Sequence, residues 1–177
     1  MLSTIVFCED RRDGPARGDL AEVLARTLAS LVTAKVEGVL CDVRIAGPAG
    51  IGLGTVANHA GCGLVEADTE ANWLHLALEA ARGPLVFLLR CGRAPEPGFI
   101  EEANEFLATE AKSKSRAAGL RAAPESLAER LFPSLAPLAG LIAPRDLMRP
   151  MPCDGFKELA RQVAPATIFH TRARRIG

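Results

Sequence analysis

Two arginines directly after a strongly apolar segment are the first candidates for binding chemistry. Residues 85–89 are all apolar, and Arg90, Cys91, Gly92 and Arg93 follow them, ahead of a loop rich in proline and glycine. In open α/β proteins, ligands bind where a central strand ends and its loop begins. Because guanidinium groups form bidentate hydrogen bonds with phosphate oxygens, Arg90 and Arg93 indicate an anion site. The alternative is that both are solvated residues at the edge of a loop.

Acidic residues end two other predicted strands. The apolar segment 2–8 is followed by Glu9 and Asp10, and a second predicted strand over residues 36–42 ends at Asp42. In a ligand-binding version of the domain, Glu9, Asp42, Arg90 and Arg93 would border one open pocket.

Strands and helices must alternate to position these residues. The hydrophobic pattern predicts strands over residues 2–8, 36–42, 62–67 and 84–90, and helices over residues 19–34, 48–61, 69–83 and 97–111. This order is typical of a parallel sheet covered by helices, and continuously apolar strands indicate burial on both faces. We predict an α/β fold, a single domain over residues 1–177 with a mostly parallel central sheet flanked by helices.

The last third of the chain is less regular. Residues 112–124 are basic and rich in small side chains, which indicates a loop. The remaining elements that the pattern predicts are a short helix within 124–137, a strand over 138–144, a helix over 155–164 and a strand over 166–171. A basic tail with Arg172, Arg174 and Arg175 follows the last strand.

Composition narrows the class of protein. Of the 177 residues, 49% are apolar and 24% are charged, as in globular domains, and 21 basic residues balance 21 acidic ones. Zero net charge gives no general attraction to nucleic acid, so we expect no specific nucleic-acid partner. No stretch approaches the roughly 18 apolar residues of a transmembrane segment. The five cysteines form no CxxC pair, which favours reduced thiols in a cytoplasmic protein and no metal site.

The order of elements resembles the first half of family 2 glycosyltransferases, above all their short bacterial members. The segments that resemble the family are "STIVFCED", "GVLCD", "AARGPLVFLL" and the closing "FHTRARRIG". The resemblance implies a GT-A fold (the fold of many nucleotide-sugar transferases) and a nucleotide-diphosphate sugar as substrate. It divides the chain into a nucleotide-binding half, 1–100, and an altered acceptor and catalytic half, 101–177. It also implies that Glu9 or Asp10 lies near the base and ribose, and that Asp42 hydrogen-bonds the nucleobase.

Two departures from the family pattern change the expected chemistry. Where the family has a metal-binding Asp-x-Asp, this chain has Arg90, Cys91 and Gly92, and arginine has no lone pair for a divalent cation. We therefore expect no metal site. In place of the catalytic base of the family, only Asp154 and Glu158 offer weak candidates. The resemblance also allows His170 to reach the diphosphate.

Two functions remain open on these grounds. In the first, the protein binds a nucleotide-sugar or transfers its glycosyl group without metal, with Arg90, Arg93 and the tail arginines neutralising the diphosphate. In the second, the domain is an inactive scaffold or a regulatory module that binds a protein partner or a second copy, and side chains such as Met148 and Met151 fill the old pocket. We expect the protein in the cytoplasm, with attachment to the inner membrane surface as a variant.

A nucleotidyltransferase ranks lower than the glycosyltransferase hypothesis. Such enzymes place a glycine-rich triphosphate loop after the first strand, whereas this chain has "EDRRDGPARG" there. The acids have the wrong sign for a triphosphate site. No P-loop and no GxSxG motif is present either.

Overall fold

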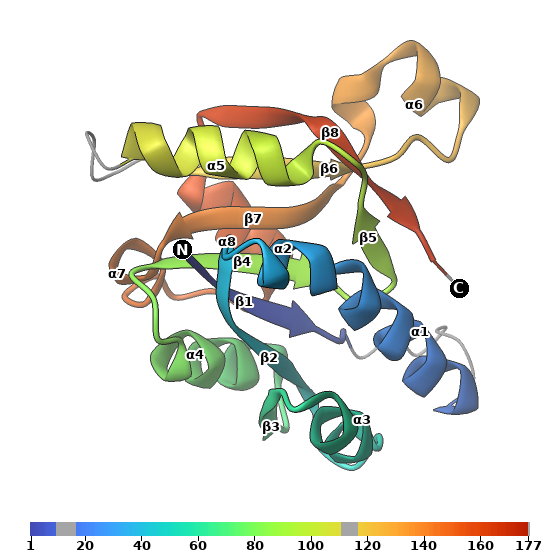
Figure 1. Ribbon diagram of the computed structural model, residues 1–177, viewed down its shortest axis with the longest axis vertical. Helices are drawn as coiled ribbons and strands as arrows, with labels where there is room; N and C mark the ends of the chain where they lie inside the picture. The colour runs from blue at the N-terminus through green and yellow to red at the C-terminus, as the bar shows by residue number, and fades with distance from the viewer. Residues whose placement is uncertain (10–16, 111–116, 177) are drawn as a thin grey trace.

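One eight-stranded sheet forms the centre of the molecule (Figure 1). The computed structural model describes residues 1–9, 17–110 and 117–176. The strand order is β3-β2-β1-β4-β7-β6-β8-β5. The strands are β1 (Leu2–Phe7), β2 (Leu40–Pro48), β3 (Gly63–Ala67), β4 (Leu85–Arg90), β5 (Arg93–Pro95), β6 (Ala118–Ala122), β7 (Leu138–Pro144) and β8 (Thr167–Arg175).

The strands β1 to β4 form a parallel unit. β1 pairs with β2 and β4, and β2 pairs with β3, all in parallel. β7 runs antiparallel to β4 and β6, β6 is parallel to β8, and β5 is antiparallel to β8. The predicted α/β domain with a mostly parallel sheet is therefore confirmed.

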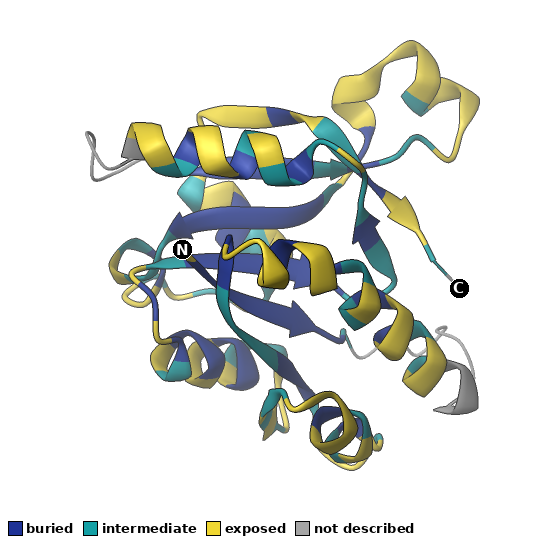
Figure 2. Cartoon of the chain, viewed as in Figure 1, coloured by how far each residue is buried: buried dark blue, intermediate teal, exposed yellow. Residues whose placement is uncertain are grey.

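Helices cover both faces of this sheet. The helices of the described chain are α1 (Arg17–Ser30), α2 (Val32–Val36), α3 (Leu53–Ala60), α4 (Glu70–Ala80), α5 (Phe99–Glu110), α6 (Leu127–Leu131), the 3-10 helix η1 (Pro133–Leu135), α7 (Arg145–Met148) and α8 (Phe156–Val163), and all but α6 and η1 pack on the sheet. One core cluster joins the sheet to α1, α2, α3 and α5, and a second joins its other face to α4, α7 and α8. Figure 2 shows the resulting dark band of buried strands between half-exposed helices.

The continuous apolar strands lie where both clusters meet. β1 is buried along its whole length, and in β4 only Leu85 is partly exposed. Trp73 on α4 is 1% exposed and stacks on Phe7, so it belongs to the core. Full burial on both faces is the property that the sequence pattern of these strands predicts.

Three predicted boundaries are wrong. β2 begins at Leu40 and continues to Pro48, beyond the predicted end at Asp42, because Asp42 and Arg44 pair with each other (3.3 Å, Arg44 Nε to Asp42 Oδ2) and are thereby tolerated inside the strand. β6 lies within the predicted loop 112–124, since small residues give little local signal for a strand. β8 continues through the predicted basic tail, and buried Ala173 fixes it to the sheet.

No helix within the described ranges combines the length and apolar character needed to cross a membrane.

Candidate functional site

An ion pair joins the carboxyl ends of β1 and β4. Phe7 and Arg90, the last residues of β1 and β4, are partners in the parallel register. Glu9, two residues after Phe7, therefore lies at the same end of the sheet as Arg90. Arg90 Nη2 lies 2.8 Å from Glu9 Oε1, and both side chains are largely buried, with exposed fractions of 9% for Arg90 and 16% for Glu9. The buried Nε of Arg90 has no hydrogen-bond partner within the described part of the chain. Arg90 therefore retains unused hydrogen-bonding capacity at the edge where α/β sheets bind ligands.

Phe156 covers this ion pair from α8. Its ring packs on Phe7 with 4.6 Å between ring centroids, and the guanidinium carbon of Arg90 lies 5.8 Å from the centroid of the Phe156 ring. The cation therefore lies over an aromatic face, an arrangement that stabilises a guanidinium group. Met148, which the scaffold alternative expected in this space, does not reach it. Met148 belongs to α7, which begins after Pro144, the register partner of Leu85 at the opposite end of β4.

Glu70 adds a second carboxylate beside the ion pair. It follows Thr69, the residue that caps α4, and its Oε1 accepts a hydrogen bond from the Phe156 backbone N–H at 2.8 Å. Burial raises the pKa of Glu70, the Phe156 hydrogen bond opposes this shift, and the nearby charge of Glu9 raises the pKa further, while Arg90 lowers it. The site thus combines a buried arginine paired with Glu9, an aromatic ring over that arginine, and the carboxylate of Glu70 held by the same aromatic residue.

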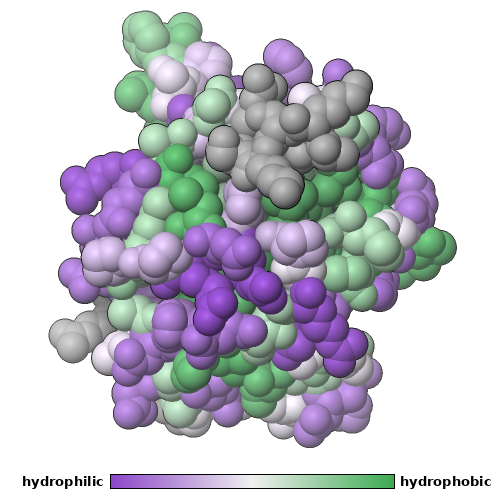
Figure 3. Space-filling view, turned by 90° about the vertical axis from the view of Figure 1, so that its left-hand side faces the viewer, coloured by the Kyte–Doolittle hydropathy of each residue, from purple (hydrophilic) through white to green (hydrophobic). Residues whose placement is uncertain are grey.

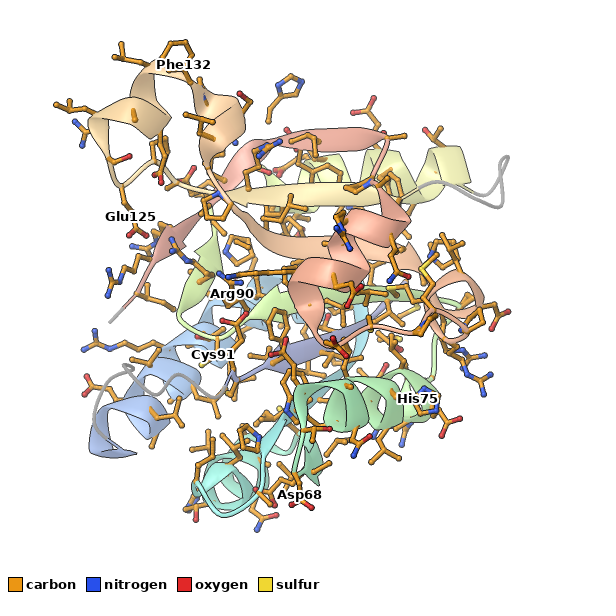
Figure 4. All side chains as sticks on the ribbon, turned by 180° about the vertical axis from the view of Figure 1, so that it is seen from behind. Asp68, His75, Arg90, Cys91, Glu125 and Phe132 are labelled. Carbon is orange, nitrogen blue, oxygen red and sulfur yellow. The ribbon has the colours of Figure 1, made fainter. Side chains whose placement is uncertain are left out.

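A tight turn fixes the residues after β4. Gly92 has a φ of +83°, a value that favours glycine, and its N–H donates to the Thr27 hydroxyl of α1 at 3.0 Å. Arg93 then starts β5 and pairs with Glu125 (2.6 Å, Nη1 to Oε1). Arg90 and Arg93 therefore have different carboxylate partners and separate environments. In Figure 4, the labelled Arg90 and Cys91 lie together near the centre, and Glu125 lies above them.

Asp42 lies near the amino-terminal ends of β1 and β2, away from the ion pair. It pairs with Ser3 at the start of β1, four residues before the Ala46 partner of Phe7, or about 13 Å along the strand. The Ser3 hydroxyl donates to Asp42 Oδ1 and accepts from the Gly83 N–H at 2.6 Å. The predicted strand ended too early, so the prediction that Asp42 borders the pocket with Glu9 and Arg90 is wrong. The carboxyl end of β2 is Pro48.

The remaining predicted site residues are dispersed. His170 is exposed on β8, and its backbone N–H donates to Glu102 of α5 at 3.1 Å. Glu158 accepts a hydrogen bond from the Asp154 N–H at 3.0 Å, which lowers the pKa of Glu158. Burial is the main cause of the raised pKa of Cys153, and the charges of Glu158, Glu70 and Asp154 raise this pKa further. Asp154 and Glu158 therefore lie near Cys153, at the start of α8. Asp10 lies outside the described residues.

The arginines of β8 lie beside β5 rather than at the Glu9–Arg90 pair. Arg175 is the register partner of Arg93 and approaches Glu125 at 3.5 Å. Arg174 is exposed, and Arg172 is half-buried with an Nη1 atom that no described residue hydrogen-bonds. These side chains form a basic edge along β5 and β8, next to Arg93.

Sequence reasoning missed Glu70 and Phe156. Glu70 stands directly after Thr69, a typical cap, at the start of the helix that follows a parallel strand. A helix that follows a parallel strand begins at the carboxyl end of that strand. The sequence position of Glu70 could therefore have predicted its place near the site. Phe156 reaches the site through tertiary packing of α8, and no local pattern indicates that contact.

Comparisons with known proteins place this fold. No protein-family model and no curated protein sequence matches the chain. Mannosyl-3-phosphoglycerate synthase from Rubrobacter xylanophilus superposes with a TM-score of 0.57 at 15% identity, over 94% of this chain and 64% of that one. Glucosyl-3-phosphoglycerate synthase from Mycobacterium tuberculosis gives a TM-score of 0.63 at 14% identity, over 94% and 68%. 4-Diphosphocytidyl-2C-methyl-D-erythritol synthase from Anaerococcus prevotii gives 0.56 at 10% identity, over 99% and 90%.

These similarities show a GT-A-like fold, as the sequence resemblance implies. The chain spans less than two thirds of the length of the Rubrobacter synthase, at 64%. At such low identities the similarity concerns the fold alone, and function must be argued from the site.

Proposed function

We propose that this protein binds a nucleotide-diphosphate sugar at the carboxyl ends of β1 and β4, with Arg90 as the fixed cation for the diphosphate. The observation that supports this most is the buried guanidinium of Arg90, whose Nε has no acceptor among the described residues. A phosphate group is a natural partner for this cation, because guanidinium groups match phosphate geometry. Glu9 and the ring of Phe156 hold the group in place before a ligand arrives.

The donor set supports a metal-independent mode of binding. Divalent cations of nucleotide-sugar enzymes need hard oxygen ligands, and the end of β4 offers Arg90 and Arg93 instead. The carboxylate of Glu9 already faces a cation, and that of Glu70 accepts a backbone N–H. A second positive charge here would be repelled by Arg90, so the residues do not fit a Mg²⁺ or Mn²⁺ ion.

The comparisons support the class of ligand. A crystal structure of the Mycobacterium tuberculosis synthase is a complex with Mn²⁺, UDP-glucose and phosphoglyceric acid. If this chain binds a similar donor without a metal, the diphosphate charge must be met by side chains. Arg90 is placed for the first contact, and Arg93 with the β8 arginines could offer further ones. For glycosyl transfer itself, Asp154 and Glu158 remain the candidate bases, since both lie at the start of α8, the helix that also carries Phe156.

Thermal-shift titration with a panel of nucleoside diphosphates and nucleotide-sugars, in EDTA and in manganese, tests this proposal. A ligand at one hundred times its dissociation constant stabilises the folded state by about 2.7 kcal/mol. We expect stabilisation in EDTA that Arg90→Lys abolishes and Arg149→Lys, an exposed control on the opposite edge, retains. Stabilisation that needs manganese, or that survives Arg90→Lys, would contradict it.

A second candidate function, a scaffold that binds a protein partner or a second copy, is favoured by one surface feature. Helix α6 and η1 project from the body of the molecule (Figure 1) and have no buried residues. The large apolar side chains of this projection are between 61% and 75% exposed: Leu127, Leu131, Phe132 and Leu135. In Figure 3 the projection forms the green top of the molecule.

The base of this projection is rigidly attached. Arg121 donates to the Ser134 and Ala136 carbonyls at 2.7 and 2.6 Å, and a capping box between Ser126 and Glu129 starts α6. Sedimentation velocity tests self-association through it. A dimer in the wild type that Phe132→Ser converts to a monomer, and that Val36→Ser on exposed α2 leaves intact, would support the scaffold. A monomer at all concentrations would leave the second-copy form without support.

A further inference from the structure

A pair of cysteine thiols lies beside the site, on the opposite face of the sheet from the ion pair. Cys8 follows Phe7 on β1, and Cys91 follows Arg90 on β4, so the two thiols come directly after register partners on neighbouring parallel strands. Cys8 is part of the core cluster beneath α1 and α5, and Cys91 packs against the same cluster. Both side chains therefore point to one face of the sheet.

Backbone hydrogen bonds hold both residues. The Cys91 N–H donates to the Phe7 carbonyl at 2.9 Å, and the Cys8 N–H donates to the Ala46 carbonyl of β2 at 2.8 Å. Neighbouring strands lie about 4.8 Å apart, which is within the Cα separation of about 4.4 to 6.8 Å that disulfides span. A hydrogen bond between the two thiols, followed by burial, raises the pKa of Cys8.

We propose that Cys8 and Cys91 are an oxidation site at which a peroxide forms a reversible intramolecular disulfide. No large movement of the backbone is required, because the two residues directly follow register partners and the Cys91 N–H is already hydrogen-bonded to the Phe7 carbonyl. The inference does not depend on the proposed nucleotide binding, since it concerns the other face of the sheet.

The two residues have different roles in this reaction. Cys91 is partly exposed and Cys8 is 2% exposed, so peroxide reaches Cys91 first. The Cys91 thiolate attacks one peroxide oxygen. An S–O bond forms, the O–O bond breaks, and the departing hydroxide takes a proton as water. The Cys8 sulfur then attacks the Cys91 sulfenic acid. The S–S bond forms, the S–O bond breaks, and the hydroxide leaves as a second water with the Cys8 proton.

The electrons balance in this scheme. Two thiols lose two electrons in total, and one hydrogen peroxide is reduced to two waters. A dithiol reductant reverses the product by thiol–disulfide exchange.

Thiol counting on the full chain tests the proposal. The reduced protein is treated with a small excess of hydrogen peroxide, quenched with catalase, denatured in N-ethylmaleimide and analysed by mass spectrometry. We expect two fewer alkylated thiols than the five of the reduced protein, and a Cys8–Cys91 linked peptide in a non-reducing digest. Dithiothreitol before alkylation should restore all five.

Variants separate this pair from the other cysteines. Cys91→Ser should lose no thiol to disulfide formation, whereas Cys153→Ser, a control with a half-buried cysteine on the other face, should still lose two. Peptide mapping of the wild type gives the same answer if Cys91→Ser does not fold. Five alkylated thiols after peroxide, a disulfide between another pair, or a Cys91 sulfinic acid beside an alkylated Cys8 would overturn the proposal.

Discussion

The guanidinium of Arg90 lies over the ring of Phe156, with 5.8 Å from its central carbon to the ring centroid. Phe156 in turn packs on Phe7, the residue of β1 that is in register with Arg90. The cation is therefore fixed between a carboxylate at the end of β1 and an aromatic side chain from α8. This arrangement connects the first half of the chain to the second at one point of the sheet edge.

Removal of the Arg90 cation should destabilise the protein strongly. In Arg90→Met, the carboxylate of Glu9 stays buried without that cation, a loss of about 3–5 kcal/mol in the free energy of unfolding. The double variant with Glu9→Gln should recover part of this loss, since no buried charge then remains at the pair. Urea denaturation of both single variants and the double variant measures the coupling. Strictly additive effects would show that the pair is not coupled.

Truncation of Phe156 should be nearly as costly. Phe156 is 1% exposed, and Phe156→Ala leaves a cavity against Phe7 and Arg90, with an expected loss of about 3–5 kcal/mol. Phe156→Leu keeps most of the volume and should cost less than about 1.5 kcal/mol. Chemical denaturation distinguishes the two. Equal losses would indicate that the ring itself, rather than its volume, supports the site.

The hydrogen bonds of Ser3 with Asp42 and Gly83, near the amino-terminal ends of the strands, should affect stability without affecting ligand binding. Ser3→Ala removes the acceptor of the buried Gly83 N–H, which costs about 1–3 kcal/mol. Asp42→Asn should also destabilise the fold, because Asp42 accepts from Ser3 and pairs with Arg44. Nucleotide affinity, measured by titration calorimetry, should be unchanged in both. A large loss of affinity in Asp42→Asn would return this residue to the site.

Most of the fold could be predicted from the sequence, because its strands are continuously apolar and its helices periodic. Local pattern could not show where β2 ends, since polar Asp42 resembles a strand end but is tolerated through its ion pair with Arg44. The site, too, was predictable only where local pattern determines it. Glu9 and Arg90 were predictable as strand-end residues, whereas Phe156 joins them through contacts between elements more than sixty residues apart.

Glu70 should make stability depend on pH. Its pKa is raised in the folded state, so the folded protein holds this proton more tightly than the unfolded chain does. Stability therefore falls as the pH rises from the ordinary glutamate pKa of 4.5 through the raised folded value. The groups around it are Glu9, Arg90, Lys157 and the Phe156 N–H.

Glu70→Gln keeps an oxygen acceptor for the Phe156 N–H and removes this titration. We expect a higher melting temperature than the wild type at pH 7.5, with a difference that shrinks toward pH 4.5. Glu66→Gln, an exposed glutamate on β3, is the matched control and should show no such trend. An advantage for Glu70→Gln that grows as the pH falls would contradict the assigned cause.

The side-chain Nε–Hε resonance of Arg90 tests the central claim most directly. It can be assigned in a ¹H–¹⁵N spectrum by its absence from Arg90→Lys, and then followed during titration with UDP and UDP-glucose in EDTA. We predict a saturable shift of this resonance, together with the backbone amides of Cys8, Glu9 and Cys91, as the diphosphate binds beside the Arg90 guanidinium. An Arg90 resonance that stays unchanged at saturating nucleotide, or that shifts only when manganese is added, would contradict the claim that Arg90 takes the place of the metal.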